Sequence, residues 1–243
     1  VLCMFLYLLF RPRWFGTMVL DDMRIEYPRY MDASLIRAFA PLREWQTNVK
    51  RGLLAQGAIV EKISIRDSYM FGPRIGFMLM DVTMHMNGVK LPGAVLLRGK
   101  SVAVLLWYRK WVSGDVHVVL VRQARVATGR MTWEVPAGMA DGNGTLKGQM
   151  FNEIKEETGL TLNVNELVHH EDASPYTSSG LLDETLELYS MQVSPDVMTK
   201  AMRTVLGKKE EGELITNVCA VPLSDARTLE DGKLRMLLSA VKM

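Results

Sequence analysis

The chain has 243 residues, of which 48% are hydrophobic, and a formal net charge of +2 at pH 7. This size and composition allow one good-sized domain, or a domain with an N-terminal extension. The small net charge excludes the strongly basic surface that is typical of nucleic-acid-binding proteins. Cys3 and Cys219 have neither metal-ligand spacing nor the pattern of a disulfide framework, so they fit a reducing compartment.

An apolar run, Val1 to Phe10, opens the chain and is followed by a basic stretch, Arg11 to Arg13. The run is too short to span a bilayer, and a secretory signal carries its basic residues before the apolar part. A truncated targeting segment, an unnatural gene-model start and a buried strand are all compatible with it. Residues 1–20 therefore form an apolar segment of uncertain role, for which we favour a remnant that carries no function. We also expect an intracellular protein with no membrane partner, in the cytoplasm or in an organelle such as the mitochondrion.

Apolar residues recur at helical spacing between residues 32 and 56, which predicts a helix that Asp32 caps and Pro41 kinks. Alternating segments predict strands over 59–67 and 75–86, and the Asn87-Gly88 turn then leads into a further strand, as in a hairpin. The remaining predicted elements are strands over 89–97, 101–108, 117–122, 186–193 and 215–222, and helices over 146–158 and 225–241. Elements in this order predict an α+β or α/β sandwich.

Three glutamates, Glu153, Glu156 and Glu157, lie within the predicted helix over 146–158. Spacings of three and four residues place their carboxylates on one helix face, one turn apart. Stacked like charges cost roughly 0.2–0.5 kcal/mol per pair, and a divalent cation would remove that cost. Hard oxygen ligands suit Mg²⁺ or Mn²⁺, which bind phosphate groups together with a few carboxylates. The alternative is a solvated acidic helix face.

The residues that flank this helix extend the pattern. Trp133-Glu-Val-Pro-Ala-Gly138 precedes it, and Thr158-Gly159 ends it. The whole resembles the Nudix box, in which a Gly and a later Glu precede the run Arg-Glu-apolar-any-Glu-Glu-any-Gly-apolar. The matching positions, all at the correct spacing, are Gly138, Glu153, Ile154, Glu156, Glu157, Gly159 and Leu160.

Two positions depart from the box. Gly144 stands where the first Glu belongs, and Asn152 stands where the Arg belongs. In the family these two residues are mainly structural and pair with each other, so the loss of both leaves no unpaired buried charge. The metal-binding carboxylates remain.

The resemblance covers nearly the whole chain from about Asp67 and is greatest to the ADP-sugar pyrophosphatase branch, above all to its plant ADP-glucose pyrophosphatase-like members. Short motifs that share order and spacing with that branch carry it: Met70-Phe-Gly-Pro-Arg-Ile-Gly-Phe77, Leu91-Pro-Gly93, Arg98-Gly99 and Gln123-Ala-Arg-Val126.

The same resemblance implies roles for further residues. Arg125 and Arg98 would contact the diphosphate or base of the substrate, and the alternative for each is a surface arginine. Glu134 matches an acidic position of the substrate site, and its alternative role is as a partner for a neighbouring basic side chain. The Ala137 carbonyl corresponds to a metal ligand beside the three helix glutamates.

The loop Ser178 to Glu184 falls where relatives carry a catalytic glutamate. Glu184 is the matching residue, and the neighbouring Asp183 could substitute for it. The alternative is an acidic turn before a strand. Glu184, Glu153 and Glu157 therefore form the expected catalytic set.

The resemblance implies a Nudix-type α/β/α sandwich with a mixed sheet at residues 98–243 and a small strand-rich subdomain at residues 21–97. The expected activity is Mg²⁺- or Mn²⁺-dependent hydrolysis of a nucleoside diphosphate sugar of the ADP-glucose or ADP-ribose class. A homodimer through the subdomain is expected, and the apolar helix face of Leu35, Phe39, Leu42 and Trp45 must be covered by a partner or by its own core. Two alternatives stay open: a degenerate Nudix fold that serves as a binding or assembly module, and hydrolysis of another diphosphate such as an RNA 5′ end, which the near-neutral charge disfavours.

Overall fold

The computed structural model describes residues 15–140, 145–170, 174–196 and 214–243, without the side chain of residue 164. The chain divides into two compact units. The first unit contains the residues up to Gly99 together with Tyr176–Glu184, and the second contains Lys100–Pro175 and Thr185–Met243.

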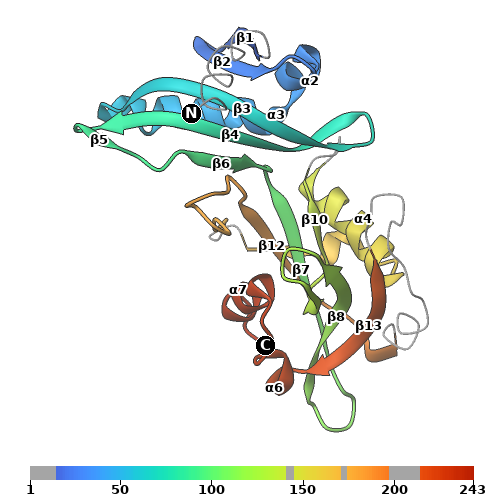
Figure 1. The fold of residues 1–243 in the computed structure, drawn as a ribbon. Coiled ribbons are helices and arrows are strands. Elements are labelled where there is room, and N and C mark those ends of the chain that lie inside the picture. Colours follow the sequence, from blue (N-terminus) through green and yellow to red (C-terminus); the bar gives the residue numbers. More distant parts are fainter. Residues whose placement is uncertain (1–14, 141–144, 171–173, 197–213) are drawn as a thin grey trace. The chain divides into compact units, whose positions relative to one another are not determined.

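The first unit is a sheet with helices packed on one face (Figure 1). Its strand order is β1-β2-β3-β4-β5, with β6 paired to β4. Among these described strands, β2 and β3 pair in parallel and the other pairs are antiparallel. The elements are β1 (Phe15–Leu20), β2 (Met23–Pro28), α2 (Ala33–Ala38), α3 (Ala40–Arg51), the 3₁₀ turn η1 (Leu54–Gln56), β3 (Ile59–Phe71), β4 (Arg74–Met86), β5 (Val89–Lys90) and β6 (Ala94–Leu97).

The core of the first unit lies between the sheet and the helices. Alternation along β4 places Met78, Met80 and Met84 on this face, where they are buried. Leu42 of α3 and Phe39, which lies between α2 and α3, are buried in the same core, against which Leu35 and Trp45 also pack. The sequence allowed either a partner or the unit's own core to cover the apolar helix face, and the core covers it.

The single helix predicted over 32–56 is wrong, because the chain forms two helices and a 3₁₀ turn. Asp32 caps α2 as predicted, by accepting a hydrogen bond from the Ser34 N–H at 2.7 Å. The break falls at Phe39, which is extended, and Pro41 lies in the first turn of α3. Proline is tolerated in a first turn, whereas a continuous helix would clash with its ring.

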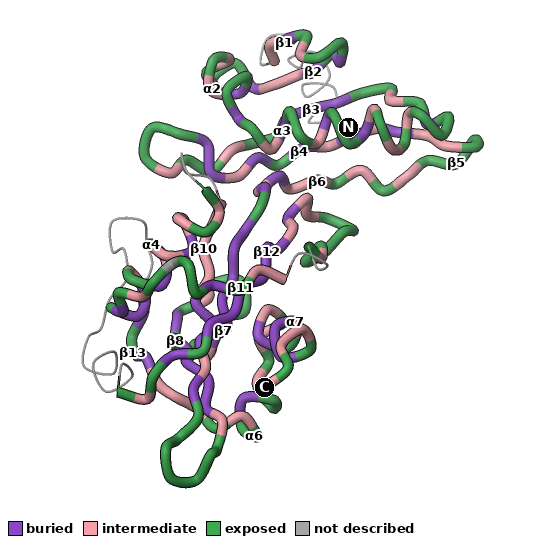
Figure 2. Tube along the Cα trace, turned by 180° about the vertical axis from the view of Figure 1, so that it is seen from behind, coloured by how far each residue is buried: buried purple, intermediate pink, exposed green. Residues whose placement is uncertain are grey.

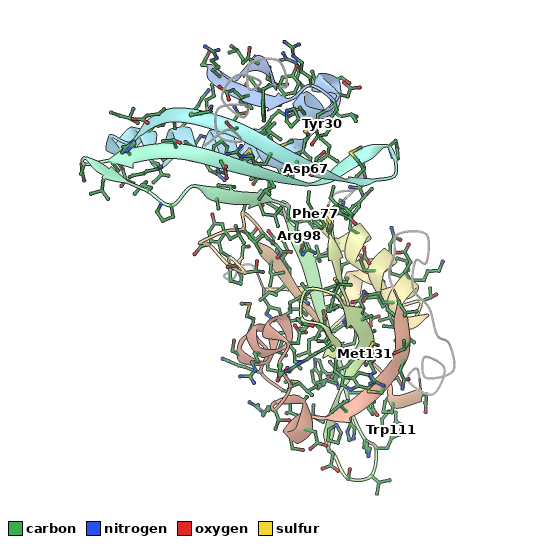
Figure 3. All side chains as sticks on the ribbon, viewed as in Figure 1. Tyr30, Asp67, Phe77, Arg98, Trp111 and Met131 are labelled. Atoms are coloured by element: carbon green, nitrogen blue, oxygen red, sulfur yellow. The ribbon has the colours of Figure 1, made fainter. Side chains whose placement is uncertain are left out.

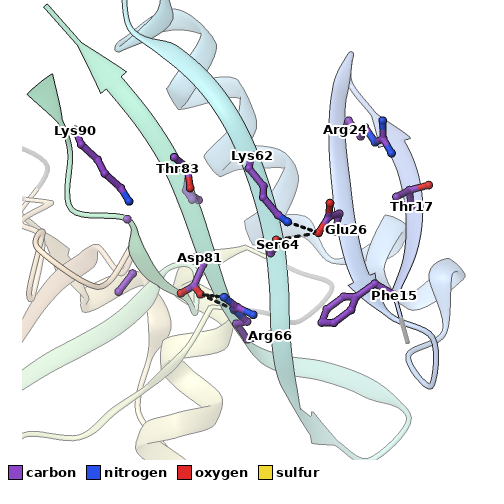
Figure 4. A pocket seen from close by; sticks show the side chains of 13 residues that line it. Phe15, Thr17, Arg24, Glu26, Lys62, Ser64, Arg66, Asp81, Thr83 and Lys90 are labelled. Carbon is purple, nitrogen blue, oxygen red and sulfur yellow. Dashed lines mark hydrogen bonds and ion pairs between the residues drawn. The ribbon is translucent and has the colours of Figure 1, made fainter. Parts of the chain in front are cut away.

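The opposite face of this sheet carries charged and polar side chains around a half-open hollow of about 750 Å³, and Figure 4 shows the side chains that line it. Lys62 Nζ lies 2.7 Å from Oε2 of Glu26, and Arg66 pairs with Asp81 on the neighbouring strand. Ser64 donates a weak hydrogen bond to Glu26 at 3.4 Å. The charged partners are 32–50% exposed, so these are solvated surface ion pairs.

The strand predicted over 89–97 forms as two short strands, β5 and β6. The hairpin turn before it is confirmed, because Asn87 and Gly88 have φ values of 52° and 79°. Gly93 interrupts the strand where the backbone passes close to β4, since an added Cβ there would lie 1.7 Å from the Val82 carbonyl oxygen.

The second unit is a mixed sheet with helices on both faces. The strand order is β11-β12-β7-β8-β13, with β10 paired to β7 and β9 to β8, and only β12 and β7 are parallel. The elements are β7 (Ser101–Arg109), β8 (Val116–Arg125), β9 (Arg130–Glu134), β10 (Ala137–Met139), α4 (Leu146–Thr158), the 3₁₀ turn η2 (Val164–Glu166), β11 (Val168–His169), β12 (Leu186–Gln192), β13 (Ile215–Pro222), α6 (Leu223–Ala226) and α7 (Gly232–Ala240).

Two apolar layers lie on either side of this sheet. Val102 and Val104 of β7 pack with Ile154 of α4 on one face, and Leu105 packs with Leu237 of α7 on the other. Strand β7 is consequently buried along most of its length, as Figure 2 shows. The predicted α/β/α sandwich with a mixed sheet is confirmed.

The sequence predicted α4 and β13 to the residue, but the single final helix over 225–241 is wrong. It forms as α6 and α7, because Asp231 caps a new helix by accepting from the Lys233 N–H at 3.1 Å. None of the helices formed by the described residues is long and apolar enough to cross a membrane.

Candidate active site

The helix that carries the glutamates is fixed at both ends by local contacts. Thr145 caps α4 by accepting from the Gly148 N–H at 3.2 Å, and Gly159 ends it with a left-handed φ of 71°. Met150 and Ile154 are fully buried beneath the helix. This packing fixes the rotation of α4 and hence the direction in which its glutamates point.

Two of the three glutamates contact β10. Glu157 is 2% exposed, and its Oε2 accepts a hydrogen bond from the Ala137 N–H at 3.1 Å. Glu153 packs against Gly138, where an added Cβ would lie 2.1 Å from Cδ of Glu153. Helical spacing keeps the half-buried Glu156 on the same face. Glu153 and Glu157 thus both lie against β10, Glu157 on the predicted Ala137, and Glu156 lies on the same helix face.

These carboxylates do not converge on one point. Among the described residues, no group of three or more His, Cys, Asp or Glu side chains is arranged to hold a metal ion. Glu157 is turned to a backbone N–H, and like charges one turn apart repel each other. The donor set still fits a hard divalent ion, because carboxylate oxygens are the ligands that Mg²⁺ and Mn²⁺ prefer. The absence of a Cβ at Gly138 also leaves the space that Glu153 occupies.

A second charged cluster centres on Glu134, which ends β9 and is 5% exposed. Arg125 donates from Nε and Nη2 to its two carboxylate oxygens, each at 2.8 Å. Lys233 of α7 donates to the same carboxylate at 2.8 Å, and the Thr132 hydroxyl donates at 2.5 Å. Arg125 and Glu134, which the sequence assigned to substrate binding, thus bind each other, and Lys233 binds the same carboxylate.

The two cations of this cluster, Arg125 and Lys233, keep the Glu134 carboxylate ionised. Burial alone would raise the pKa of Glu134, but the hydrogen bond from Arg125 and the charges of Lys233 and Arg125 outweigh it. The pKa of Glu134 is therefore held well below its usual range, and the group stays ionised. Glu134 takes the alternative role that the sequence offered, as a partner of basic side chains, and its contact with substrate stays a prediction.

Arg98 and Glu184 form a further ion pair, in the first unit. Arg98 Nε lies 3.1 Å from Oε1 of Glu184, which is 6% exposed and accepts from the Thr177 hydroxyl at 2.8 Å. The Arg98 guanidinium also lies over the ring of Phe77, 5.5 Å from its centroid (Figure 3). These contacts hold the predicted catalytic carboxylate in one position.

The neighbouring Asp183 has a different role. It accepts hydrogen bonds from the backbone N–H groups of Arg98, at 2.6 Å, and Gly99, at 3.1 Å. Burial raises the pKa of Asp183 above its ordinary value in spite of these hydrogen bonds. Asp183 therefore joins its own loop to the residues that follow β6, and no pattern in the sequence indicated this contact.

Two contacts escaped the sequence analysis. Lys233 lies 99 positions from Glu134, and no local pattern links residues so far apart. His169 Nε2 lies 2.9 Å from Oε2 of Glu187. The sequence signal that could have pointed to this contact is a glutamate between two leucines in a predicted strand, now β12. Of the two departures from the Nudix box, Asn152 is exposed on α4, and Gly144 lies outside the described residues.

No family model matches the chain. In fold it is similar to the crystal structure of an ADP compounds hydrolase, with a TM-score of 0.50 and 19% identity over 76% of this chain and 90% of that one. In sequence it is 33% identical to Nudix hydrolase 14, chloroplastic, of Arabidopsis thaliana over 217 residues, which cover 83% of this chain and 69% of the relative. It is also 33% identical to putative nudix hydrolase 2 of Caenorhabditis elegans, over 40% of this chain and 41% of that protein.

A mixed sheet between helices, with a glutamate-bearing helix seated against a glycine of the preceding strand, defines a protein of the Nudix type. The extent of the match to the Arabidopsis thaliana relative makes the assignment specific: this chain belongs to the Nudix hydrolase family.

Proposed function

We propose that the protein hydrolyses the diphosphate bond of a nucleoside diphosphate sugar of the ADP-glucose or ADP-ribose class. The products would be a nucleoside monophosphate and a sugar phosphate. The observation that carries the proposal is the seating of α4 on β10, with Glu157 on the Ala137 N–H and Glu153 against Gly138. One solved structure with a similar fold is that of an ADP compounds hydrolase, and ADP compounds are the substrate class proposed here.

Nudix hydrolases generally use divalent metal ions. Mg²⁺ or Mn²⁺ would be held here by Glu153, Glu156 and Glu157, with the Ala137 carbonyl completing the set. When bound, such an ion neutralises charge on the diphosphate and so favours attack by water at phosphorus. The protein's own part is to keep three carboxylates on one helix face, which the caps and buried side of α4 achieve.

The other predicted residues would act on substrate and water. Glu184 would orient the attacking water or accept its proton, and Arg98 holds its carboxylate at 3.1 Å. Arg125 and Arg98 would contact the diphosphate. A guanidinium carries five N–H donors, so an arginine that binds a carboxylate can also donate to a phosphate oxygen. Glu134 would keep Arg125 in place for that contact.

The decisive experiment is a panel of diphosphate substrates assayed with Mg²⁺ and again with EDTA. We expect hydrolysis of ADP-sugars that EDTA abolishes, and a weaker or absent reaction with a capped RNA. Glu157→Gln serves as the inactive control, and Glu230→Gln as the matched one, because Glu230 is 78% exposed in its ion pair with Arg130. A wild-type protein that hydrolyses no substrate in the panel would contradict the proposal and favour a degenerate Nudix fold used as a binding module.

We also propose that the protein forms a homodimer through its first unit. The support is the resemblance to the branch in which this part of the chain forms the dimer, because the helix face that also suggested a partner is covered by the unit's own core. Light scattering at micromolar concentration tests this proposal, and a monomer would contradict it.

A further inference from the structure

A buried carboxylate without a role in the function proposed so far lies on the α4 face of the second sheet. Glu187 of β12 is 8% exposed, and its Oε2 lies 2.9 Å from Nε2 of His169 on β11. The His169 ring also stacks on Tyr189, with centroids 4.5 Å apart. Alternation along β12 places Glu187 and Tyr189 on the same face, and Tyr189 packs in the core under α4.

The strand register shows how near this carboxylate lies to the glutamate helix. Glu187 pairs with Val102 of β7, and Val102 pairs with Gly138 of β10. These residues form one row across adjacent strands, so the Cα atoms of Glu187 and Gly138 are two strand spacings, about 10 Å, apart. Gly138 is the residue against which Glu153 packs. Glu187 therefore shares both a face and a row with the place where α4 seats its first glutamate.

The position is an unfavourable one for a carboxylate. Its neighbours on the same face, Val102 and Tyr189, are 0% and 2% exposed and belong to the core under α4. A well-packed apolar residue in place of a buried ion pair is often neutral or stabilising. A buried acid held by a histidine, in the same row as Gly138, is placed to exchange a proton with a group bound beside the α4 glutamates.

We propose that Glu187, oriented by His169, accepts the proton of the attacking water, which leaves Glu184 the role of orienting that water. The inference rests on the diphosphate hydrolysis proposed above. In the step, the water oxygen forms a bond to phosphorus and its proton moves to the Glu187 carboxylate. The bond from phosphorus to the leaving phosphate oxygen breaks, and that oxygen keeps the electron pair. His169, stacked on Tyr189, is the positioning residue that fixes the carboxylate.

The test variant is Glu187→Gln, which keeps the size of the side chain and removes the base. We expect kcat to fall about 100-fold, the low end for loss of a general base, and KM to stay within about twofold. Mn²⁺ affinity measured by calorimetry should also stay within about twofold, because Glu187 is not placed among the ligands. Activity of Glu187→Ala should rise again with added formate, which supplies a carboxylate to the vacated space.

The same two strands offer a matched control. His170 Nε2 lies 2.9 Å from the Ser190 hydroxyl on the opposite face of the sheet. His169→Asn should lower kcat about tenfold, through loss of positioning, whereas His170→Asn should leave it within about twofold. An equal loss of kcat in both variants would overturn the inference, because the loss would then come from disturbing the pairing of β11 with β12 and not from Glu187.

Three further outcomes are decisive. A kcat of Glu187→Gln within threefold of wild type overturns the inference and leaves the proposed hydrolysis standing. Absence of hydrolysis in the wild-type protein overturns the proposed function itself, and the inference with it. If Glu187→Gln does not fold, Glu187→Asp takes its place, and full activity of that shortened acid overturns the inference while a loss of about tenfold or more supports it.

Discussion

The two sheets of this protein differ in how far their charged side chains are exposed to solvent. The sheet of the first unit is covered by helices on one face, and its other face carries solvated pairs such as Arg66 with Asp81. The sheet of the second unit is apolar on both faces. An exposed ion pair is worth little and needs no function to explain it, whereas a carboxylate between apolar layers must be offset by specific contacts. Buried Glu134, Glu157 and Glu187 are therefore the informative charges of the second unit.

The largest expected effect tests whether the buried acid of α4 is functional. Glu157→Gln should lower diphosphate hydrolysis at saturating Mg²⁺ at least about 100-fold, because a charged oxygen ligand worth several kcal/mol in the transition state is lost. The Ala137 N–H can still donate to the amide oxygen, so thermal stability should change little. Steady-state kinetics and a melting curve measure the two quantities. Near-wild-type turnover would show that the metal assignment is wrong.

The first sheet offers a stability test on a single strand. Ile65 of β3 is fully buried and Ile59 is 65% exposed, so the pair compares the covered and open environments within one element. Ile65→Ala should lower the free energy of unfolding by about 2–5 kcal/mol, through lost burial and a residual cavity. Ile59→Ala should cost about 0.5 kcal/mol or less. Urea denaturation measures both, and equal costs would contradict the packing described for β3.

Much of the second unit was predictable because its signals are local. The bounds of α4 follow from the glutamate-bearing apolar pattern and from Gly159, whose positive φ ends the helix. Strand β13 follows from its apolar run. The break at Phe39 was missed, because a proline such as Pro41 can mark a helix start as well as a kink. The cap at Asp231 was also missed, and Asp231 in addition accepts a hydrogen bond from the Val135 N–H, which lies far away in the sequence.

The residues of the candidate site come from local spacing, whereas their contacts do not. Spacing along one helix gave Glu153, Glu156 and Glu157 directly. The partners of Glu134 and Glu187 depend on tertiary pairing, since Lys233 and His169 reach them from other elements of the fold. The assignment of Tyr176–Glu184 to the first unit is likewise set by long-range contacts and has no sequence signal.

The stability cost of removing a charge should differ between Glu134 in the second unit and Asp81 on the open face of the first sheet. Glu134→Gln should cost about 2 kcal/mol, less than the 3–5 of a fully buried pair, because Arg125 and Lys233 are 37% and 21% exposed. Asp81→Asn on the open face should cost about 0.5 kcal/mol or less. Chemical denaturation at neutral pH compares the two, and equal values would break the contrast.

The pH dependence of that cost has a definite sign. The pKa of folded Glu134 lies below its unfolded value, so its stabilisation is present above the ordinary carboxyl pKa. The contribution is lost as pH falls through the lowered folded pKa. The stability difference between wild type and Glu134→Gln should therefore shrink as pH drops from about 5 into the strongly acidic range. A difference that grows with acidity would contradict the ion pairing.

A smaller effect is expected at the glycine under α4. Gly138→Ala places a Cβ 2.1 Å from Cδ of Glu153, so that carboxylate must move. We expect turnover to fall about tenfold with the helix retained, because displacement of a positioned group costs rate more than it costs folding. Gly232→Ala is the matched control, since nothing lies within 4 Å of an added Cβ there. Circular dichroism and kinetics separate the two effects, and unchanged turnover in Gly138→Ala would remove Glu153 from the site.

The smallest effect concerns the departures from the Nudix box. Asn152 is exposed on α4, so Asn152→Arg should change stability by no more than about 0.5 kcal/mol, as on the open face of the first sheet. Gly144→Glu alone should be slightly unfavourable, because it adds a lone charge near the helix. The two together should be neutral or mildly stabilising, since the new side chains can pair with each other. A thermal double-mutant cycle measures the coupling, and strictly additive effects would show that the two positions do not interact in this protein.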